Sequence, residues 1–221
     1  MRLVHAVHEP AGEGPHATVV ALHGWGASAL DLLALAPHLD AGEFLVLCPQ
    51  GPVAVPIAPG VSGYGWFPLS LGGPPDARAF EDGYAAIDTF LGDAARRYPI
   101  ARGKLALLGF SQGGVMAYAL ALRQPQRFAA VAALSTWLVP GLVDGAAPLP
   151  ALDDLPVLVQ HGASDPVIAA ERGREAVEQL RACRADVTYR EYEMGHEIST
   201  ASLRDLGEFL HRRLVSSIVS V

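Results

Sequence analysis

The sequence has little cysteine, few basic residues and no long uncharged apolar run, and each shortage excludes a class of protein. Its 221 residues include two cysteines, Cys48 and Cys183, which make neither a disulfide framework nor a thiolate metal cluster. Sixteen Lys and Arg stand against 23 Asp and Glu, and this net charge of -7 argues against a nucleic-acid partner or an anionic membrane surface. No apolar run approaches the roughly 18 residues of a spanning helix, and residues 1–14 lack a signal-peptide core. We expect a cytoplasmic protein without stable membrane insertion.

What the sequence does contain is a regular alternation of apolar and amphipathic segments. Apolar runs predict buried strands over residues 17–24, 43–49, 104–110, 128–136, 155–162 and 186–194. Amphipathic patterns predict helices over residues 28–40, 76–98, 112–124, 169–183 and 199–215. This order is typical of an α/β fold, a mostly parallel sheet with helices on both faces.

No linker or internal repeat interrupts the alternation, so we expect a single domain over residues 1–221. Two segments are predicted to be irregular, residues 50–75 and 138–154. Both follow strands, at the edge where ligands bind in open parallel sheets.

One serine lies at the turn between a predicted strand and a predicted helix. The segment "GFSQG", residues 109–113, places Ser111 between two glycines at this turn. A G-x-S-x-G turn holds its serine in a strained conformation, with the hydroxyl exposed above the carboxyl edge of the sheet. The alternative is that Ser111 only caps the following helix.

The residues that a nucleophilic serine needs follow in the required order. A serine needs an imidazole to accept its proton, and the imidazole needs a carboxylate to orient it. Asp165 comes just after the predicted strand 155–162, and His196 just after the strand 186–194. The sequence therefore predicts a triad of Ser111, Asp165 and His196. Since an imidazole with the ordinary pKa of about 6.5 must start neutral, activity should rise from acid to neutral pH.

These segments together resemble the phospholipase/carboxylesterase family of α/β-hydrolases, which includes acyl-protein thioesterases and small bacterial carboxylesterases. The similar segments are "LHGWG" (residues 22–26), "GFSQGG" (109–114), "HGASDPVI" (161–168) and "MGHEI" (194–198). The resemblance implies an α/β-hydrolase fold without a large cap domain and no cofactor. We also expect no metal, because the sequence has no H-x-x-x-H pair in a predicted helix and no Cys/His cluster. It also implies a small-molecule ester as substrate, in a monomer or homodimer.

The resemblance agrees with a prediction for the oxyanion hole. An acyl-transfer oxyanion needs fixed donors, which we expect to be the backbone N–H groups of Trp25 and Gln112. Two further histidines, His23 and His161, precede glycines at strand ends and are expected to brace the active-site loops.

The acyl pocket is predicted from the loops at the same edge. Many family members carry an aromatic pair followed by aspartate, whereas here Pro68 follows Trp66 and Phe67. We expect residues 52–75 to form a pocket wall, with candidate lining residues Tyr64, Trp66, Phe67, Trp137 and Leu138. For each of these residues, ordinary packing is the alternative.

The function predicted from the sequence is a serine carboxylesterase for short- to medium-chain esters. An acyl thioesterase or a lysophospholipase would use the same triad, and a peptidase ranks below them. A non-catalytic ligand-binding protein on this fold is the alternative from another class. The natural substrate and the oligomeric state do not follow from the sequence.

Overall fold

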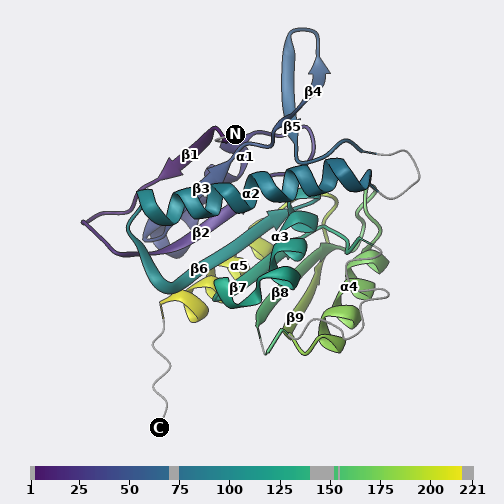
Figure 1. Cartoon of the computed structure of the whole chain (residues 1–221). Helices are drawn as coiled ribbons and strands as arrows, with labels where there is room; N and C mark the ends of the chain where they lie inside the picture. The colour runs from purple at the N-terminus through teal and green to yellow at the C-terminus, as the bar shows by residue number, and fades with distance from the viewer. Residues whose placement is uncertain (1–2, 70–74, 140–151, 154, 216–221) are drawn as a thin grey trace.

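The computed structural model describes residues 3–69, 75–139, 152–153 and 155–215. In it, a seven-stranded sheet has the order β1-β3-β2-β6-β7-β8-β9 (Figure 1). Strand β1 runs antiparallel to β3, and the remaining neighbours are parallel. The strands of this sheet are β1 (His5–His8), β2 (His16–Leu22), β3 (Leu45–Pro49), β6 (Ile100–Phe110), β7 (Ala130–Leu134), β8 (Pro156–Gly162) and β9 (Asp186–Tyr192).

Helices cover both faces of this sheet, as the apolar runs predict. The helices are α1 (Ala29–Leu33), α2 (Ala77–Arg97), α3 (Gln112–Arg123), α4 (Ala170–Ala182) and α5 (Thr200–Leu214). Along β2, Val20 and Leu22 pack with α2, α3 and α4, whereas Val19 and Ala21 pack with α1 and α5. Since successive side chains of a strand point to opposite faces, a continuous apolar run supplies both cores. The predicted α/β-hydrolase architecture is confirmed, and the described residues include no large cap.

The helix predicted over residues 28–40 is shorter than expected. Helix α1 begins after Ser28, whose side chain accepts from the Leu30 N–H while Asp31 accepts from the Ser28 N–H. It ends at Leu33 and is followed by 3₁₀ turns at Ala36–His38 and Asp40–Gly42; a third 3₁₀ turn is Pro125–Arg127. Pro37 explains the early end, because it lacks the N–H that would bond to the Leu33 carbonyl.

The segment predicted to be irregular, residues 50–75, contains a β-hairpin. Strands β4 (Val53–Ala58) and β5 (Val61–Gly65) pair antiparallel and project from the body of the molecule (Figure 1). Pro59 and Gly60 form its two-residue turn, and Gly60 has φ 74, a conformation that glycine adopts without strain. Residues 70–74 of this segment, and most of the second predicted irregular segment, 138–154, lie outside the described residues. Among the helices of the described chain, none is long and apolar enough to cross a membrane.

Candidate active site

Ser111 lies on a sharp turn between β6 and α3. Its backbone has φ 53 and ψ -121, a conformation that costs free energy for any residue with a side chain. Backbone hydrogen bonds hold the turn: the Ser111 N–H donates to the Leu134 carbonyl, and the Ser111 carbonyl accepts from the N–H groups of Gly114 and Val115. The serine is 9% exposed, and its hydroxyl makes no hydrogen bond to another described residue. The turn therefore presents an unengaged hydroxyl beside the sheet edge.

The two glycines that flank Ser111 permit this close turn. A Cβ atom on Gly113 would lie 1.9 Å from the Leu22 carbonyl oxygen, and one on Gly109 would lie 2.4 Å from the Gly113 oxygen. Because both obstacles are backbone atoms, neither position accepts a side chain without moving a strand or the helix. The G-x-S-x-G spacing is thus a steric requirement of this fold.

Asp165 and His196 come together from the ends of β8 and β9. The Nδ1–H of His196 donates to Asp165 Oδ2 at 2.7 Å. The other carboxylate oxygen, Oδ1, accepts from the N–H groups of Val167 and Ile168 at 2.8 and 2.9 Å. The Asp165 side chain is fully buried. This arrangement leaves Nε2 of His196 as the unprotonated nitrogen of a neutral ring.

The surroundings of Asp165 keep it ionised. Burial alone would raise the pKa of the Asp165 carboxyl, but the hydrogen bonds from Ile168, His196 and Val167 outweigh it, so its pKa lies below the ordinary value. His161 closes the same loop, since its Nε2 lies 2.8 Å from the Ile168 carbonyl oxygen and 3.6 Å from Asp165 Oδ2. The carboxylate is thus fixed in position and in charge.

Ser111 and His196 line a common cavity of about 330 Å³. Its wall also includes Trp25 and residues from α1 and from the loop after β9. The residues that line it are His23, Gly24, Trp25, Ala27, Asp31, Leu32, Leu35, Phe110, Ser111, His196, Glu197 and Ile198. The Phe110 ring packs on the His196 ring with their centroids 4.9 Å apart. The cavity has room for a small ester beside the serine hydroxyl.

The two predicted oxyanion donors belong to peptide groups whose carbonyl oxygens form hydrogen bonds with side chains. In a trans peptide the carbonyl and the N–H point in opposite directions, so a bond to the carbonyl also aims the N–H. His23 Nδ1 bonds to the Gly24 carbonyl at 2.7 Å, which orients the Trp25 N–H. The Thr136 hydroxyl donates to the Ser111 carbonyl at 2.7 Å, which orients the Gln112 N–H. The hydrogen bonds of the described residues include none donated by either N–H.

His23 must be neutral to play this part. Its Nε2 accepts from the Gly51 N–H at 3.0 Å, so the ring proton is on Nδ1. Burial lowers the pKa of His23, and it outweighs the opposing influence of the Gly24 carbonyl. The bracing of a loop by His23 was expected from its place before a glycine, whereas sequence reasoning missed Thr136. The only signal for Thr136 in the sequence is its place at the end of the predicted strand 128–136.

Sequence reasoning also missed the side chain of Gln112. This buried amide accepts from the Trp66 N–H at 2.8 Å and donates to the Phe67 carbonyl at 2.7 Å. The Trp66 indole N–H in turn donates to the His23 carbonyl at 2.8 Å. The residue after the serine therefore ties the hairpin base to the loop that carries Trp25.

The residues predicted to line an acyl pocket are not among those that line this cavity. Trp66 and Phe67 are 0% and 2% exposed and belong to the core beneath the hairpin, and Leu138 is also buried. Tyr64 and Trp137 are partly exposed. The ordinary packing alternative describes Trp66, Phe67 and Leu138 better than a role in this cavity.

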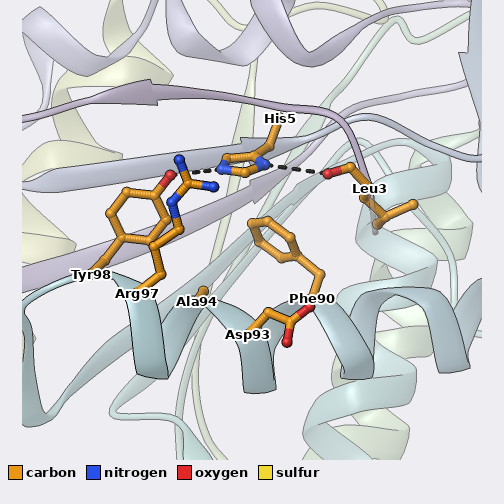
Figure 2. Close-up of a pocket in the computed structure, with 7 residues that line it drawn as sticks. All are labelled: Leu3, His5, Phe90, Asp93, Ala94, Arg97 and Tyr98. Carbon is orange, nitrogen blue, oxygen red and sulfur yellow. Dashed lines mark hydrogen bonds between the residues drawn. The ribbon is translucent and has the colours of Figure 1, made fainter. Parts of the chain in front are cut away.

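A second cavity, of about 60 Å³, lies between the N-terminal segment and α2 (Figure 2). His5 Nε2 lies 2.7 Å from the Tyr98 hydroxyl, and Nδ1 lies 3.3 Å from the Leu3 carbonyl oxygen. This second cavity has room for a few water molecules, and no serine or cysteine is among the residues that line it. The described residues also contain no group of three His, Cys, Asp or Glu that could hold a metal ion.

Comparison with known proteins shows the family and the fold of this chain. Residues 4–214 match the model of the phospholipase/carboxylesterase family. The chain is 29% identical to acyl-protein thioesterase 1 of Gibberella zeae, over 93% of this chain and 94% of that one. It is also 29% identical to a probable carboxylesterase of Oryza sativa subsp. japonica, over 98% and 85% of the two chains.

Solved structures show the same fold. Esterase PE8 superposes with a TM-score of 0.83 and 28% identity, over 97% of this chain and all of that one. A carboxylesterase of Bacillus cereus superposes with a TM-score of 0.81 at 22% identity, over 96% and 94%. The chain therefore belongs to the phospholipase/carboxylesterase family and is a serine ester hydrolase with the α/β-hydrolase fold.

Proposed function

We propose that this protein is a carboxylesterase that cleaves short- to medium-chain esters through Ser111, His196 and Asp165. The observation that carries the proposal is the arrangement of the three side chains. A strained turn presents Ser111 to a cavity that His196 also lines, and buried Asp165 holds His196 by its Nδ1–H. We also propose that the chain is one domain, cytoplasmic, and a monomer or homodimer acting on small molecules.

The first half of the reaction forms an acyl-enzyme. Ser111 Oγ attacks the acyl carbon while His196 Nε2 takes the hydroxyl proton. The negative charge moves to the former carbonyl oxygen, which accepts from the N–H groups of Trp25 and Gln112. The tetrahedral intermediate then collapses, and His196 passes its proton to the departing alkoxide to release the alcohol.

The second half returns the enzyme to its starting state. Water attacks the acyl-enzyme, and His196 takes one of its protons. Collapse of the second tetrahedral intermediate breaks the bond to Ser111 Oγ, which regains the proton from His196. The products are one carboxylic acid and one alcohol, and the enzyme is unchanged. Throughout, Asp165 stabilises the imidazolium by remaining ionised.

A second candidate is an acyl thioesterase with the same machinery. The support is the match to acyl-protein thioesterase 1 of Gibberella zeae over nearly the whole of both chains. The geometry of the triad does not favour an oxygen ester over a thioester, because both pass through the same oxyanion. The two candidates are separated by substrate, with matched pairs of oxygen esters and thioesters that carry the same acyl group.

The test is hydrolysis of p-nitrophenyl esters from acetate to palmitate by the wild type, Ser111→Ala and Ser164→Ala. Ser164 is an exposed serine next to Asp165 and serves as the matched control. We expect the rate of hydrolysis to be highest for esters with short acyl chains. The rate should be almost completely lost in Ser111→Ala and unchanged in Ser164→Ala. A wild type that neither turns over any ester or thioester nor reacts with a fluorophosphonate would overturn the proposal in favour of a binding protein.

A further inference from the structure

The cavity beside Ser111 carries negative charge and aromatic surface on its wall. Of the residues that line it, Asp31 and Glu197 are carboxylic acids, and no lysine or arginine is among them. Both acids are exposed to solvent at the rim. The buried His23 adds no charge, because its Nε2 accepts from the Gly51 N–H and therefore carries no proton. An incoming group therefore meets two carboxylates and no basic side chain.

The two carboxylates are held differently. Asp31 Oδ2 accepts from the N–H and the hydroxyl of Ser28 at 2.8 and 2.7 Å, in the capping box that begins α1. This leaves Oδ1 without a hydrogen bond from another described residue. Glu197 directly follows His196, and its side chain has no ion pair or hydrogen bond within the described part of the chain. Each acid thus retains acceptor capacity for a ligand.

His196 lines this cavity, so the cavity includes the place from which the alcohol leaves. The leaving oxygen must be near His196, which returns the proton to it. His196, Glu197 and Ile198 form one continuous wall of the cavity. The acyl group lies against a different wall, because the substituents of a tetrahedral carbon point in different directions. Within the cavity, the lining nearest His196 is therefore the surface that the alcohol portion of the ester contacts.

We propose that Asp31 and Glu197 select esters whose alcohol portion carries a positive charge, such as a quaternary ammonium or protonated amine. The proposal rests on the proposed esterase function and names its substrate class. Carboxylates attract the charge, and the rings of Trp25 and Phe110 offer aromatic surface of the kind that binds quaternary ammonium groups. The chain's net charge of -7 attracts cationic and repels anionic substrates at longer range.

The test compares butyrylcholine with 3,3-dimethylbutyl butyrate, which has carbon in place of the ammonium nitrogen. The measured quantity is the ratio of their kcat/KM values in one protein, so a general loss of activity cancels. We expect Glu197→Gln to lower this ratio about threefold and Asp31→Asn with Glu197→Gln to lower it about five- to tenfold, as weak solvent-exposed charge pairs allow. The ratio in the wild type should also fall as salt rises from low concentration to 0.5 M.

Glu193→Gln is the matched control, because Glu193 is an exposed acid after β9 that does not line the cavity. It should leave the ratio unchanged. A ratio that responds to neither Glu197→Gln nor the double substitution overturns the cation site, while Ser111-dependent hydrolysis of p-nitrophenyl butyrate leaves the esterase standing. If the wild type hydrolyses no ester at all, the proposed function fails and this inference fails with it.

Discussion

The Thr136 hydroxyl gives the sharpest test of how the oxyanion hole is held. Thr136→Val keeps the shape of the side chain and removes only the hydrogen bond to the Ser111 carbonyl. That carbonyl still accepts from the N–H groups of Gly114 and Val115 at 2.9 and 3.3 Å. Because the oxygen stays partnered, the cost in folding free energy should be low, about 0.5–1.5 kcal/mol.

The expected effect on catalysis is larger than this loss of stability implies. Complete loss of one oxyanion donor costs about 10²–10³ in kcat, and here the Gln112 N–H remains but is less well aimed. We therefore expect kcat to fall about tenfold with KM nearly unchanged, since the misdirected donor acts on the oxyanion and not on bound substrate. Thr136→Ser, which restores the hydroxyl, should recover most of the activity.

The assay is steady-state hydrolysis of p-nitrophenyl butyrate at saturating and at low substrate, together with urea unfolding of each variant. Unfolding identifies any variant that has lost activity because it no longer folds. Folded Thr136→Val with unchanged kcat would refute the idea that the peptide between Ser111 and Gln112 is aimed through its carbonyl. Equal losses in Thr136→Ser and Thr136→Val would point to side-chain packing instead.

Three further predictions follow from the same contacts. Gln112→Ala leaves the Trp66 N–H and the Phe67 carbonyl without their partner, which should cost about 2–6 kcal/mol in urea unfolding, at about 1–3 kcal/mol per buried group; a loss under 1 kcal/mol would contradict this. Asp165→Asn cannot accept the His196 Nδ1–H as a carboxylate does, so kcat should fall about 10³–10⁴-fold with little change in KM, and activity within tenfold of wild type would be a contrary result. Burial lowers the pKa of His23 below 6.5, so the unfolded chain binds a proton at His23 more readily than the folded chain does. The contribution of neutral His23 to the free energy of unfolding is therefore complete above pH 6.5 and decreases below it, by at most about 1.4 kcal/mol per pH unit. Urea midpoints between pH 5 and 8 check this, and a midpoint that is flat over that range would exclude it.

Much of the sheet could be predicted from the sequence because its strands are apolar on both faces. The apolar run 104–110 lies within β6, and the run 155–162 includes the whole of β8. The short strand β1 (His5–His8) was missed, since four partly exposed residues at an edge carry little pattern. The hairpin was missed because a proline within a run argues against a strand. Pro56 is accepted because it lies on β4, an edge strand that pairs with β5 alone among the described strands.

The triad residues could be named from the sequence because each follows a recognisable strand end. The supporting contacts could not be predicted, because they depend on which side chain the folded chain brings within hydrogen-bond distance of a backbone group. Nothing in the order of residues shows that Thr136 bonds to the Ser111 carbonyl or that Gln112 reaches Trp66. The predicted acyl pocket has the same difficulty, since an aromatic pair such as Trp66 and Phe67 has the same sequence pattern whether it contacts a ligand or packs in a core.

Backbone hydrogen bonds join the hairpin to the catalytic body near its base. The Gly26 N–H donates to the Tyr64 carbonyl, and the Tyr64 N–H to the Ala27 carbonyl, at 2.9 and 2.7 Å. Beyond this bridge, Ile57 and Val61 are exposed near the tip. Lengthening both strands by two residues would keep every side chain on its present face, whereas adding one residue to a strand would reverse the faces. A change in length at the tip therefore leaves the bridge at Tyr64, and with it the loop that carries Trp25, in place.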